Sequence, residues 1–399
     1  MAVMVVVQQE LPDRAEVVVI GGGVIGTAVA HELARDGITD VVVLEAGEIG
    51  SGSSAKPLGG VRATFSDPAN VELSAWSLRR YAEFEASFSR SIGLHQVGYL
   101  FLITDEDDLP AAEAAIEVQN AFGSRAELVD PGRAAELCPP LHPERLLAAS
   151  WSPDDGFAQP SLVLQAYAES AAAAGVRVLT GQTVTGFDHT AGEVSGVAVS
   201  DRLIRTQSVI CCAGAWSGVL ARLAGIALPV EPVKRQIAML PAPRSAAWPQ
   251  VPFTLDLRTT MYFHNGSFGS VAAAAGDPML IGISDPATPV GFDREPSLEW
   301  LTPFRAAAQR LAPGLAEPEP FDIWAGLYEN TPDHNALIGR QGNFVYATGF
   351  SGHGFLQAPG VGRLVADLLQ GRSSFMDPTP FSLDRFGSRT GEFRELHII

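Results

Sequence analysis

The stretch AEVVVIGGGVIGTAVAHELARDGITDVVVLE, residues 15–45, decides the fold class. Residues 16–20 and 41–45 are runs of apolar, largely β-branched side chains, as strands buried on both faces require. Between them a helical pattern follows Gly26 and ends at Gly37, where a left-handed cap is expected. The segment is therefore predicted to form a strand, a helix and a second strand of a parallel sheet.

The glycine spacing in the first turn is typical of a dinucleotide cradle. Gly21 allows a tight turn, Gly23 lets the backbone approach a pyrophosphate, and Gly26 lets the helix pack on the strand. The helix N-terminus presents N–H groups to the phosphates, and Glu45 can accept bonds from ribose hydroxyls. A glycine-rich turn also serves ordinary strand-to-helix joints, but here strand, helix and carboxylate occur together, which favours the dinucleotide site.

A second glycine-rich turn, GFSGHGF at 349–355, opens another helix far along the chain. NAD and FAD both use the first cradle, but FAD is long, and one turn cannot hold both its adenine and its isoalloxazine ring. The N-terminus of the later helix suits the N1–C2=O edge of that ring, where negative charge collects on reduction. Residues 47–62, GEIGSGSSAKPLGGVR, offer small and hydroxyl side chains to wrap the pyrophosphate. The two turns together predict FAD.

Composition restricts the partners. The chain has 399 residues, is 46% hydrophobic and 18% charged, and carries 27 Lys+Arg against 45 Asp+Glu, a net charge of −18. A nucleic-acid backbone would be repelled, and no basic patch opposes this. Three cysteines without a CxxC or His/Cys cluster argue against a disulfide framework or a metal site. No apolar span of 18 residues and no signal-peptide pattern occur, so we expect a cytoplasmic protein without a membrane span.

The pattern along the chain predicts two domains. The first is an α/β FAD-binding domain of the Rossmann-like, glutathione-reductase type, built from residues 14–95, 150–234 and 325–385. The second is an inserted α+β substrate domain on an antiparallel sheet, built from residues 96–149 and 235–324, where short alternating runs and prolines are frequent.

The motifs, taken in order, resemble those of the FAD-dependent amino-acid oxidoreductases, which include sarcosine oxidase, glycine oxidase, D-amino-acid oxidase and the β subunits of the proline and dimethylglycine dehydrogenase types. The resemblance covers nearly the whole chain. It rests on GGGVIGTAVAHELARDG, GSGSSAKPLGGVR, SVICCAGAWS, LIGISDP, GLYENTPDHNALIG and GFSGHGFLQAPGVG. It implies oxidation of an amine by FAD and says less about the substrate.

The resemblance also implies substrate-binding and catalytic residues. Arg62 matches an arginine that holds the substrate carboxylate, which a guanidinium can grip with two bonds; its other interpretation is a surface arginine paired with Asp67 or Glu72. Tyr262 and His264, placed on one face by strand alternation, match a pocket wall, although a lone histidine there is more often simply packed. Tyr328 matches a residue placed against the flavin.

The expected cofactor contacts extend beyond the two glycine turns. By resemblance, Val184 supplies a backbone contact to adenine, and the turn at 213–217 lines the cofactor, with Trp216 equally compatible with a core position. The full expected set is Gly21, Gly23, Val24, Ile25, Gly26, Glu45, Ala46, Ser53, Ser54, Lys56, Gly59, Gly60, Val184, Ala213, Gly214, Trp216, Gly326, Ser351, Gly352, His353, Gly354, Phe355 and Leu356.

Two departures from the monomeric sarcosine oxidases carry consequences. Those proteins tether the flavin through a cysteine where this chain has Gly326, so FAD is expected to be non-covalent. They also place lysines where this chain has Leu356 and, by alignment, Leu280, which removes a cation that favours oxygen reduction. Glycine and D-amino-acid oxidases lack the first lysine and still use oxygen. The electron acceptor, O2 or a redox partner, therefore stays open.

The sequence thus predicts oxidation of the C–N bond of a small amino acid or a secondary or N-substituted amine, giving an imine that water hydrolyses. One alternative is an FAD-holding electron-transfer or assembly subunit of a larger dehydrogenase complex. A flavin monooxygenase or NAD(P)H-dependent reductase is disfavoured, because its flavin domain usually ends in a GD-type ribose contact and the corresponding strand here runs into ATGFSGHGF. Oligomeric state is not predicted.

Overall fold

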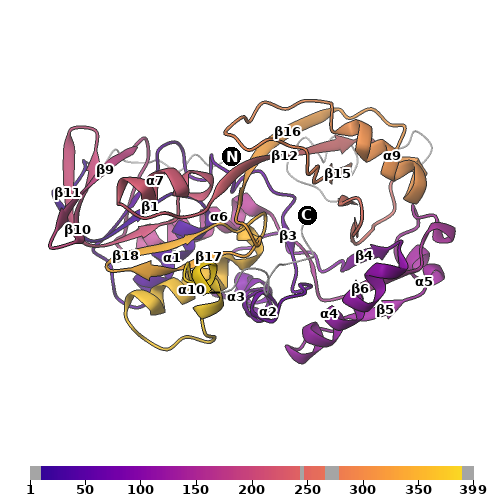
Figure 1. Cartoon of the computed structure of the whole chain (residues 1–399), viewed down its shortest axis with the longest axis horizontal. Coiled ribbons are helices and arrows are strands. Elements are labelled where there is room, and N and C mark those ends of the chain that lie inside the picture. Colours follow the sequence, from indigo (N-terminus) through magenta and orange to yellow (C-terminus); the bar gives the residue numbers. More distant parts are fainter. Residues whose placement is uncertain (1–9, 243–246, 266–277, 389–399) are drawn as a thin grey trace. The chain divides into compact units, whose positions relative to one another are not determined.

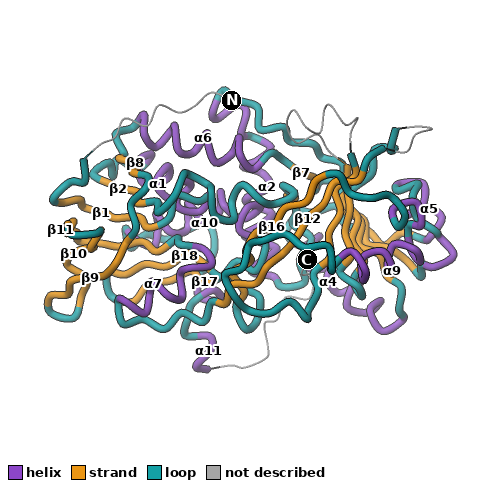
Figure 2. Tube along the Cα trace, turned by 90° about the horizontal axis from the view of Figure 1, so that it is seen from above, coloured by secondary structure: helices purple, strands orange, loops and turns teal. Residues whose placement is uncertain are grey.

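The computed structural model describes residues 10–242, 247–265 and 278–388. The N-terminal residues 1–9, in which no signal-peptide pattern is recognised, lie outside the described residues. The chain forms two compact units. The first unit takes its described residues from Met1–Ala55, Ser161–Glu231 and Glu329–Glu392, and the second unit from Lys56–Pro160 and Pro232–Tyr328. The strands of each unit are drawn in orange in Figure 2.

The first unit is built on a largely parallel sheet with the order β17-β18-β11-β1-β2-β8. β18, β11, β1, β2 and β8 pair in parallel, whereas β17 pairs with β18, and a β9–β10 hairpin with β11, in antiparallel fashion. The bounds are β1 Arg14–Ile20, β2 Val41–Leu44, β8 Arg177–Leu179, β9 Val184–Thr190, β10 Glu193–Val199, β11 Arg202–Cys211, β17 Leu337–Gln341 and β18 Phe344–Thr348.

Helices α1 (Val24–Arg35) and α10 (Gly354–Leu369) lie side by side in the first unit (Figure 1). A methyl group on Gly362 would come within 2.9 Å of the Ala28 carbonyl oxygen, so a glycine is required for this close approach. α1 begins before Gly26, which therefore lies inside the helix rather than ahead of it. α6 (Pro160–Ala173), α7 (Ser217–Leu223) and the short α11 (Arg385–Ser388) complete the described helices of this part of the chain.

The second unit contains an eight-stranded sheet with the order β16-β12-β15-β14-β13-β4-β6-β5. Its bounds are β4 Tyr99–Ile103, β5 Glu127–Val129, β6 Ala148–Ser152, β12 Glu231–Leu240, β13 Phe253–Asp256, β14 Met261–Asn265, β15 Met279–Ile283 and β16 Asp322–Asn330. The sheet, expected to be antiparallel, includes a parallel pair, β13 with β4. The chain leaves the unit within β16, after Tyr328.

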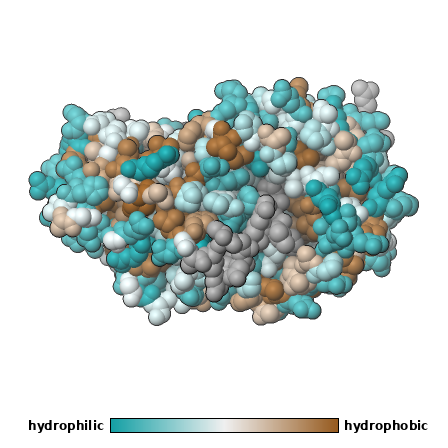
Figure 3. All heavy atoms as spheres, in the orientation of Figure 1, coloured by the Kyte–Doolittle hydropathy of each residue, from teal (hydrophilic) through white to brown (hydrophobic). Residues whose placement is uncertain are grey.

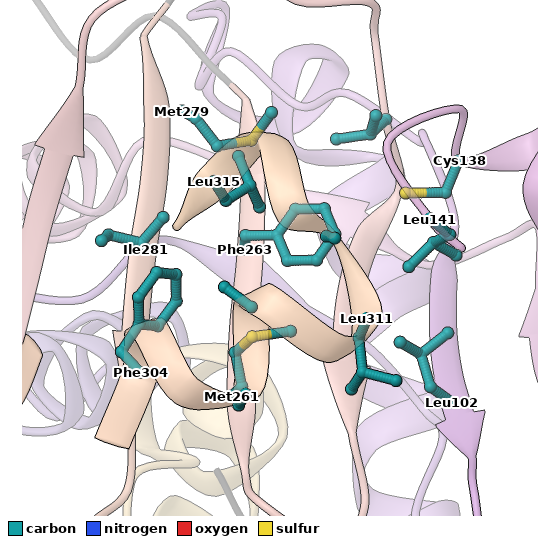
Figure 4. Packing of buried hydrophobic residues seen from close by; sticks show 14 of the residues in the cluster. Leu102, Cys138, Leu141, Met261, Phe263, Met279, Ile281, Phe304, Leu311 and Leu315 are labelled. Atoms are coloured by element: carbon teal, nitrogen blue, oxygen red, sulfur yellow. The ribbon is translucent and has the colours of Figure 1, made fainter. Parts of the chain in front are cut away.

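The two faces of this second sheet differ. One face packs on α9 (Leu301–Leu311): Figure 4 shows Phe304 and Leu311 among Met261, Phe263 and Ile281 of the strands. The other face is aromatic and carries Tyr99, Phe101, Ile237, Met239, Phe253, Leu255, Tyr262 and Leu280. We call this second surface the aromatic face. It holds the candidate substrate residues.

The unit boundaries differ from the expected domains in four places. Residues 56–95, 150–160, 232–234 and 325–328, expected in the FAD-binding domain, cluster with the second unit. Contacts between distant segments explain this assignment. β3 (Gly60–Val61) pairs with β7 (Gly156–Phe157), and the Phe65 carbonyl accepts a hydrogen bond from Gln119 in α4 (Leu109–Ala121). α2 (Pro68–Ala82), α3 (Phe84–Phe88) and α5 (Pro131–Leu137) belong to the same unit.

Surface hydropathy and helix length show whether the described part of the chain has a membrane-spanning helix. On the face drawn in Figure 3, hydrophilic side chains prevail and apolar ones form small groups. None of the helices in the part of the chain that the structure describes is both long and apolar enough to cross a bilayer.

Candidate functional site

The first glycine turn admits no side chain at its two key positions. Gly21 has φ +110°, and a methyl group there would lie 2.2 Å from the Cys212 carbonyl oxygen. A methyl group on Gly26 would lie 1.9 Å from the Gly21 carbonyl oxygen. The turn is therefore packed against the end of β11 and against its own helix. Its three glycines bring backbone without side chains to the start of α1.

Glu45 and Ser54 hold this turn from the far side. One carboxylate oxygen of Glu45 accepts from the Gly22 N–H at 2.7 Å and the other from the Gly47 N–H at 2.8 Å. Ser54 Oγ accepts from the Val24 N–H at 2.9 Å and so caps α1. A carboxylate offers about four acceptor sites, so two bonds leave Glu45 able to accept from a ribose hydroxyl.

The second glycine turn has the strained backbone of a binding loop. Gly349, Ser351 and Gly352 have φ values of +72°, +49° and +98°. Ser351 is fully buried, and its positive φ is unusual for a residue with a side chain. α10 then begins at Gly354, with His353 at its N-cap.

Both turns lie at the same edge of the first sheet. β1, β11 and β18 are adjacent and parallel, with Ile20 opposite Cys211 and Cys211 opposite Tyr346. Their carboxyl ends therefore lie together, and they continue into Gly21, the turn at 213–216 and Gly349. The edge beyond the carboxyl ends of parallel strands is where ligands bind in open α/β sheets.

A half-buried carboxyl group, Glu329, supports the second turn and was missed by the sequence analysis. It accepts from Thr348 Oγ1 at 2.7 Å and from the Gly349 N–H at 2.9 Å. Burial raises its pKa to about 6, and these hydrogen bonds oppose the rise. Its only signal in the sequence is an acidic residue inside GLYENTPD, which periodicity does not distinguish from a solvent-exposed strand residue.

The other expected cofactor residues of the first unit differ in burial. Val24, Ile25, Val184, His353, Phe355 and Leu356 are buried, whereas Ala46 and Gly352 are exposed and Gly23, Ser53, Ala213, Gly214 and Trp216 are half-buried. A methyl group on Gly52 would lie 3.7 Å from the Trp216 ring, which places the turn at 213–216 beside the segment after β2. Gln182, just before Val184, donates its N–H to the Glu45 carbonyl.

These features fit an FAD molecule. Two bare glycine turns at helix N-termini, a carboxylate at the end of β2 and small residues after it lie in one unit. Packing against β11 requires the glycine at 21, and close packing of turn and helix requires the one at 26, as in a dinucleotide cradle.

In the second unit, Arg62 is fully buried, with 1% of its surface exposed. This excludes its interpretation as a surface arginine. Its guanidinium lies 4.0 Å from the centre of the Phe65 ring and 5.4 Å from that of Phe101, and it donates to the Thr64 carbonyl. An arginine stacked on aromatic rings is fixed in orientation and shielded from water.

Asp155 is a buried carboxyl group that lies close to Arg62 in space but far from it in sequence. The sequence analysis missed it too. It accepts from the Ala63 N–H at 3.0 Å and from Thr64 Oγ1 at 2.9 Å. Burial raises its pKa to about 6, whereas these two bonds and the charge of Arg62 oppose the rise. The carboxyl group thus fixes the backbone that follows Arg62.

Tyr262, His264 and Tyr328 are placed as follows. Tyr262 and His264 both contact the Phe253 ring, with centroids 6.1 Å and 4.6 Å away, so they share the aromatic face. His264 is completely buried, and burial lowers its pKa to about 4. A neutral, packed imidazole is the alternative that the sequence analysis left open for it. Burial raises the pKa of Tyr328, while Arg235 and Arg62 oppose this.

The remaining expected cofactor residues, Lys56, Gly59, Gly60 and Gly326, all belong to the second unit. Methyl groups on Gly59 and Gly60 would lie 2.0 Å from the Ala158 oxygen and 1.9 Å from the Tyr99 hydroxyl, so packing within the unit already requires both glycines. A Cβ on Gly326 would lie 2.9 Å from Cβ of Lys56. That contact disfavours the larger cysteine found in flavin-tethering relatives.

Comparison with known proteins defines the class of this protein as an FAD-dependent oxidoreductase. The model of the FAD dependent oxidoreductase (DAO) family matches residues 16–368, so the chain belongs to this family. Its cofactor is FAD, as the two glycine turns predicted.

Relatives of similar length cover almost the whole chain. Glycine oxidase of Geobacillus kaustophilus is 30% identical, over 96% of this chain and 100% of that protein. FAD-dependent oxidoreductase domain-containing protein 1 of Bos taurus is also 30% identical, over 97% and 87%. Among solved structures, L-proline dehydrogenase from P. horikoshii is 33% identical with a TM-score of 0.85, covering 94% of this chain and 99% of that one.

Proposed function

We propose that this protein oxidises the C–N bond of a small amino acid or of a secondary or N-substituted amine. The carbon loses a hydrogen with two electrons, the C–N bond becomes an imine, and water then hydrolyses the imine to an amine and a carbonyl compound. The observation that carries the proposal is the buried Arg62, held rigid between aromatic rings on the same unit as Tyr262 and Tyr328. Relatives named for glycine, L-proline and dimethylglycine oxidation support the substrate class.

Each side chain has a stated task in this proposal. Arg62 grips the substrate carboxylate with two hydrogen bonds and so orients the carbon that is oxidised. Tyr262 and Tyr328 form the wall that excludes water from the amine. Bound FAD accepts the two electrons and the hydrogen. The amine binds in its neutral form, so no base is required, in keeping with the depressed pKa of His264.

The residues that would hold FAD are those of the two glycine turns, with Glu45 toward the ribose and the N–H groups at the start of α10 toward the flavin ring. Glycine at position 326 supports non-covalent binding. Leu280 is completely buried beside His264 on the aromatic face, so no cation occupies that position. This chain therefore relies on other groups if O2 is its acceptor, and a redox partner serves equally well.

Anaerobic flavin bleaching tests the proposal. The purified yellow protein is mixed without oxygen with sarcosine, L-proline, glycine and D-amino acids, and the loss of flavin absorbance is followed. We expect at least one amine to bleach the flavin, and dye acceptors and O2 to restore its colour at different rates. A yellow protein that no amine reduces would contradict the proposal and favour the alternative of an FAD-holding subunit of a complex.

A further inference from the structure

Arg235, on β12, is a second arginine in the interior of the second unit, and the sequence analysis did not single it out. Strand alternation places it on the same side of β12 as Ile237 and Met239, which belong to the aromatic face. The side chain is half-buried, and burial lowers its pKa. It is therefore a guanidinium largely removed from water on the surface that carries Tyr262 and Tyr328.

The hydrogen bonds of Arg235 are incomplete. Its Nη1 donates to the Lys234 carbonyl at 3.1 Å, while its Nε is buried with no partner among residues 10–242, 247–265 and 278–388. No carboxylate within that described part of the chain lies within ion-pair distance of it, and the charge of Asp285 acts on it only from farther away. The neighbouring Lys234 differs, because its ammonium pairs with Asp293 at 2.5 Å and with the Glu295 carbonyl at 3.0 Å.

A buried cation without a counter-charge is costly, and proteins usually provide a partner for it. Other largely covered arginines in the described residues do have such an ion pair, among them Arg177, Arg363 and Arg385. Arg235 instead lies over the Tyr328 ring, 5.5 Å from its centre. The missing charge is therefore expected from a ligand.

Tyr328 connects Arg235 with Arg62. The positive charges of both arginines oppose the rise in the pKa of its phenol, so both lie within electrostatic range of the same hydroxyl. Burial and the neighbouring Tyr328 raise the pKa of Tyr262, and the positive charge of Arg235 opposes this rise. Two guanidinium groups and two phenols are thus gathered on one unit, and a carboxylate held by Arg62 does not by itself give the Arg235 Nε a partner.

We propose that Arg235 binds a second anionic group of the substrate, so that the preferred substrate is an amino acid with two carboxylates. This inference rests on the proposed function, in which Arg62 takes the α-carboxylate. Arg235 then takes the carboxylate of the side chain or of the N-substituent. It determines specificity and takes no part in breaking the C–H bond.

Calorimetric titration of the holoenzyme tests the site without turnover. The probes are succinate, with two carboxylates, and propionate, with one. We expect the wild type to bind succinate at least tenfold more tightly than propionate, and Arg235→Gln to reduce that ratio about tenfold or more, because charge-assisted bonds to a buried arginine are lost. Lys234→Gln, on the opposite side of the same strand, should leave the ratio unchanged.

Kinetics with N-methyl-aspartate and N-methyl-alanine give a second readout. Arg235→Gln should lower the preference for the dicarboxylic amine in kcat/KM by a similar factor while FAD content and circular dichroism match the wild type. Equal preference of the wild type for both probes, or an equal loss for both in the variant, would overturn the inference. If no amine is oxidised but succinate binding depends on Arg235, the proposed function fails and the anion site stands.

Discussion

Arg62 combines a permanent charge with almost complete burial, which makes it the most informative single residue of the second unit. The stacked rings of Phe65 and Phe101 fix its plane, and the Thr64 carbonyl accepts one of its donors. A guanidinium held in this way loses little entropy when a carboxylate binds. Its effect should therefore appear in substrate binding.

Arg62→Ala is predicted to raise KM for carboxylated amines about a hundredfold or more, because two charge-assisted bonds are lost. FAD content should stay at the wild-type level. Steady-state kinetics with the best substrate of the bleaching screen measures the change in KM. Arg62→Lys keeps the charge but cannot form two parallel hydrogen bonds, so its KM should lie between those of the wild type and Arg62→Ala. Unchanged KM in Arg62→Ala would remove this residue from the site.

Asp155 predicts a pH dependence of stability. Its pKa is raised from 3.8 to about 6, so the folded state favours the protonated form. The stabilising contribution is complete below about pH 4 and is lost as the pH rises through 6. The wild type should lose about 2–3 kcal/mol of unfolding free energy relative to Asp155→Asn between pH 3.5 and 7.

Urea unfolding of both proteins across this pH range measures that difference. Taking the difference between the two proteins cancels the other carboxyl groups, some of which, such as Asp36, have a lowered pKa and the opposite trend. A difference that is flat with pH, or that grows in favour of the wild type toward pH 7, would show that burial does not control this carboxyl group.

At the scale of elements, the first unit depends on two helices whose N-termini carry the glycine turns. α1 and α10 are joined by Arg363, which bonds Glu32 at 2.9 Å, Asp36 at 2.6 Å and Asp367 at 2.8 Å. These groups are mostly covered, with Arg363 at 18% exposure. The ion network thus fixes the pair of helices, and through them the spacing of the two turns.

Arg363→Gln is predicted to lower the unfolding free energy by about 1–3 kcal/mol, because three partly buried carboxylates lose their common partner. It should also weaken FAD binding, since the turns at both helix ends depend on the pairing of α1 and α10. Chemical unfolding and FAD titration measure the two effects. Arg133→Gln, which removes an exposed pair with Glu136, is the control and should change stability by less than about 0.5 kcal/mol.

At the scale of the whole molecule, the chain passes between the two units four times within the described residues, after Ala55, Pro160, Glu231 and Tyr328. Each unit is therefore assembled from segments that are distant in sequence. We expect FAD to bind the glycine turns of the first unit, whose segments come from both halves of the chain. Binding to the folded state should consequently stabilise the assembly of those segments.

The non-covalent site predicts that acid precipitation releases all of the yellow colour into the supernatant. The apoprotein should then have a lower Tm than the holoenzyme, and added FAD should restore it in a concentration-dependent way, by about 4 kcal/mol at a thousandfold excess over Kd. Absorbance of the supernatant and differential scanning calorimetry test this. Colour retained in the pellet would indicate a covalent link.

The sequence by itself determined the cofactor and the core of the first unit. Strands β1 and β2 and the glycine turns follow from short-range patterns: runs of apolar residues and positions where only glycine fits. The same local rules predicted the strand that runs into the second glycine turn, and placed Tyr262 and His264 on one face of β14. Such features depend on neighbours within a few residues, so one strand or helix is enough to show them.

Only the tertiary structure decided which distant side chains meet. The sequence does not show that Glu329 bonds to Gly349, or that β7 pairs with β3 and brings Asp155 close to Arg62. It also does not show that Arg235 lies over the ring of Tyr328. The unit boundary at Ala55 rather than near residue 95 has the same origin. Burial and charge pairing arise from long-range register, and the free energy of a buried charge depends on what surrounds it in space rather than along the chain.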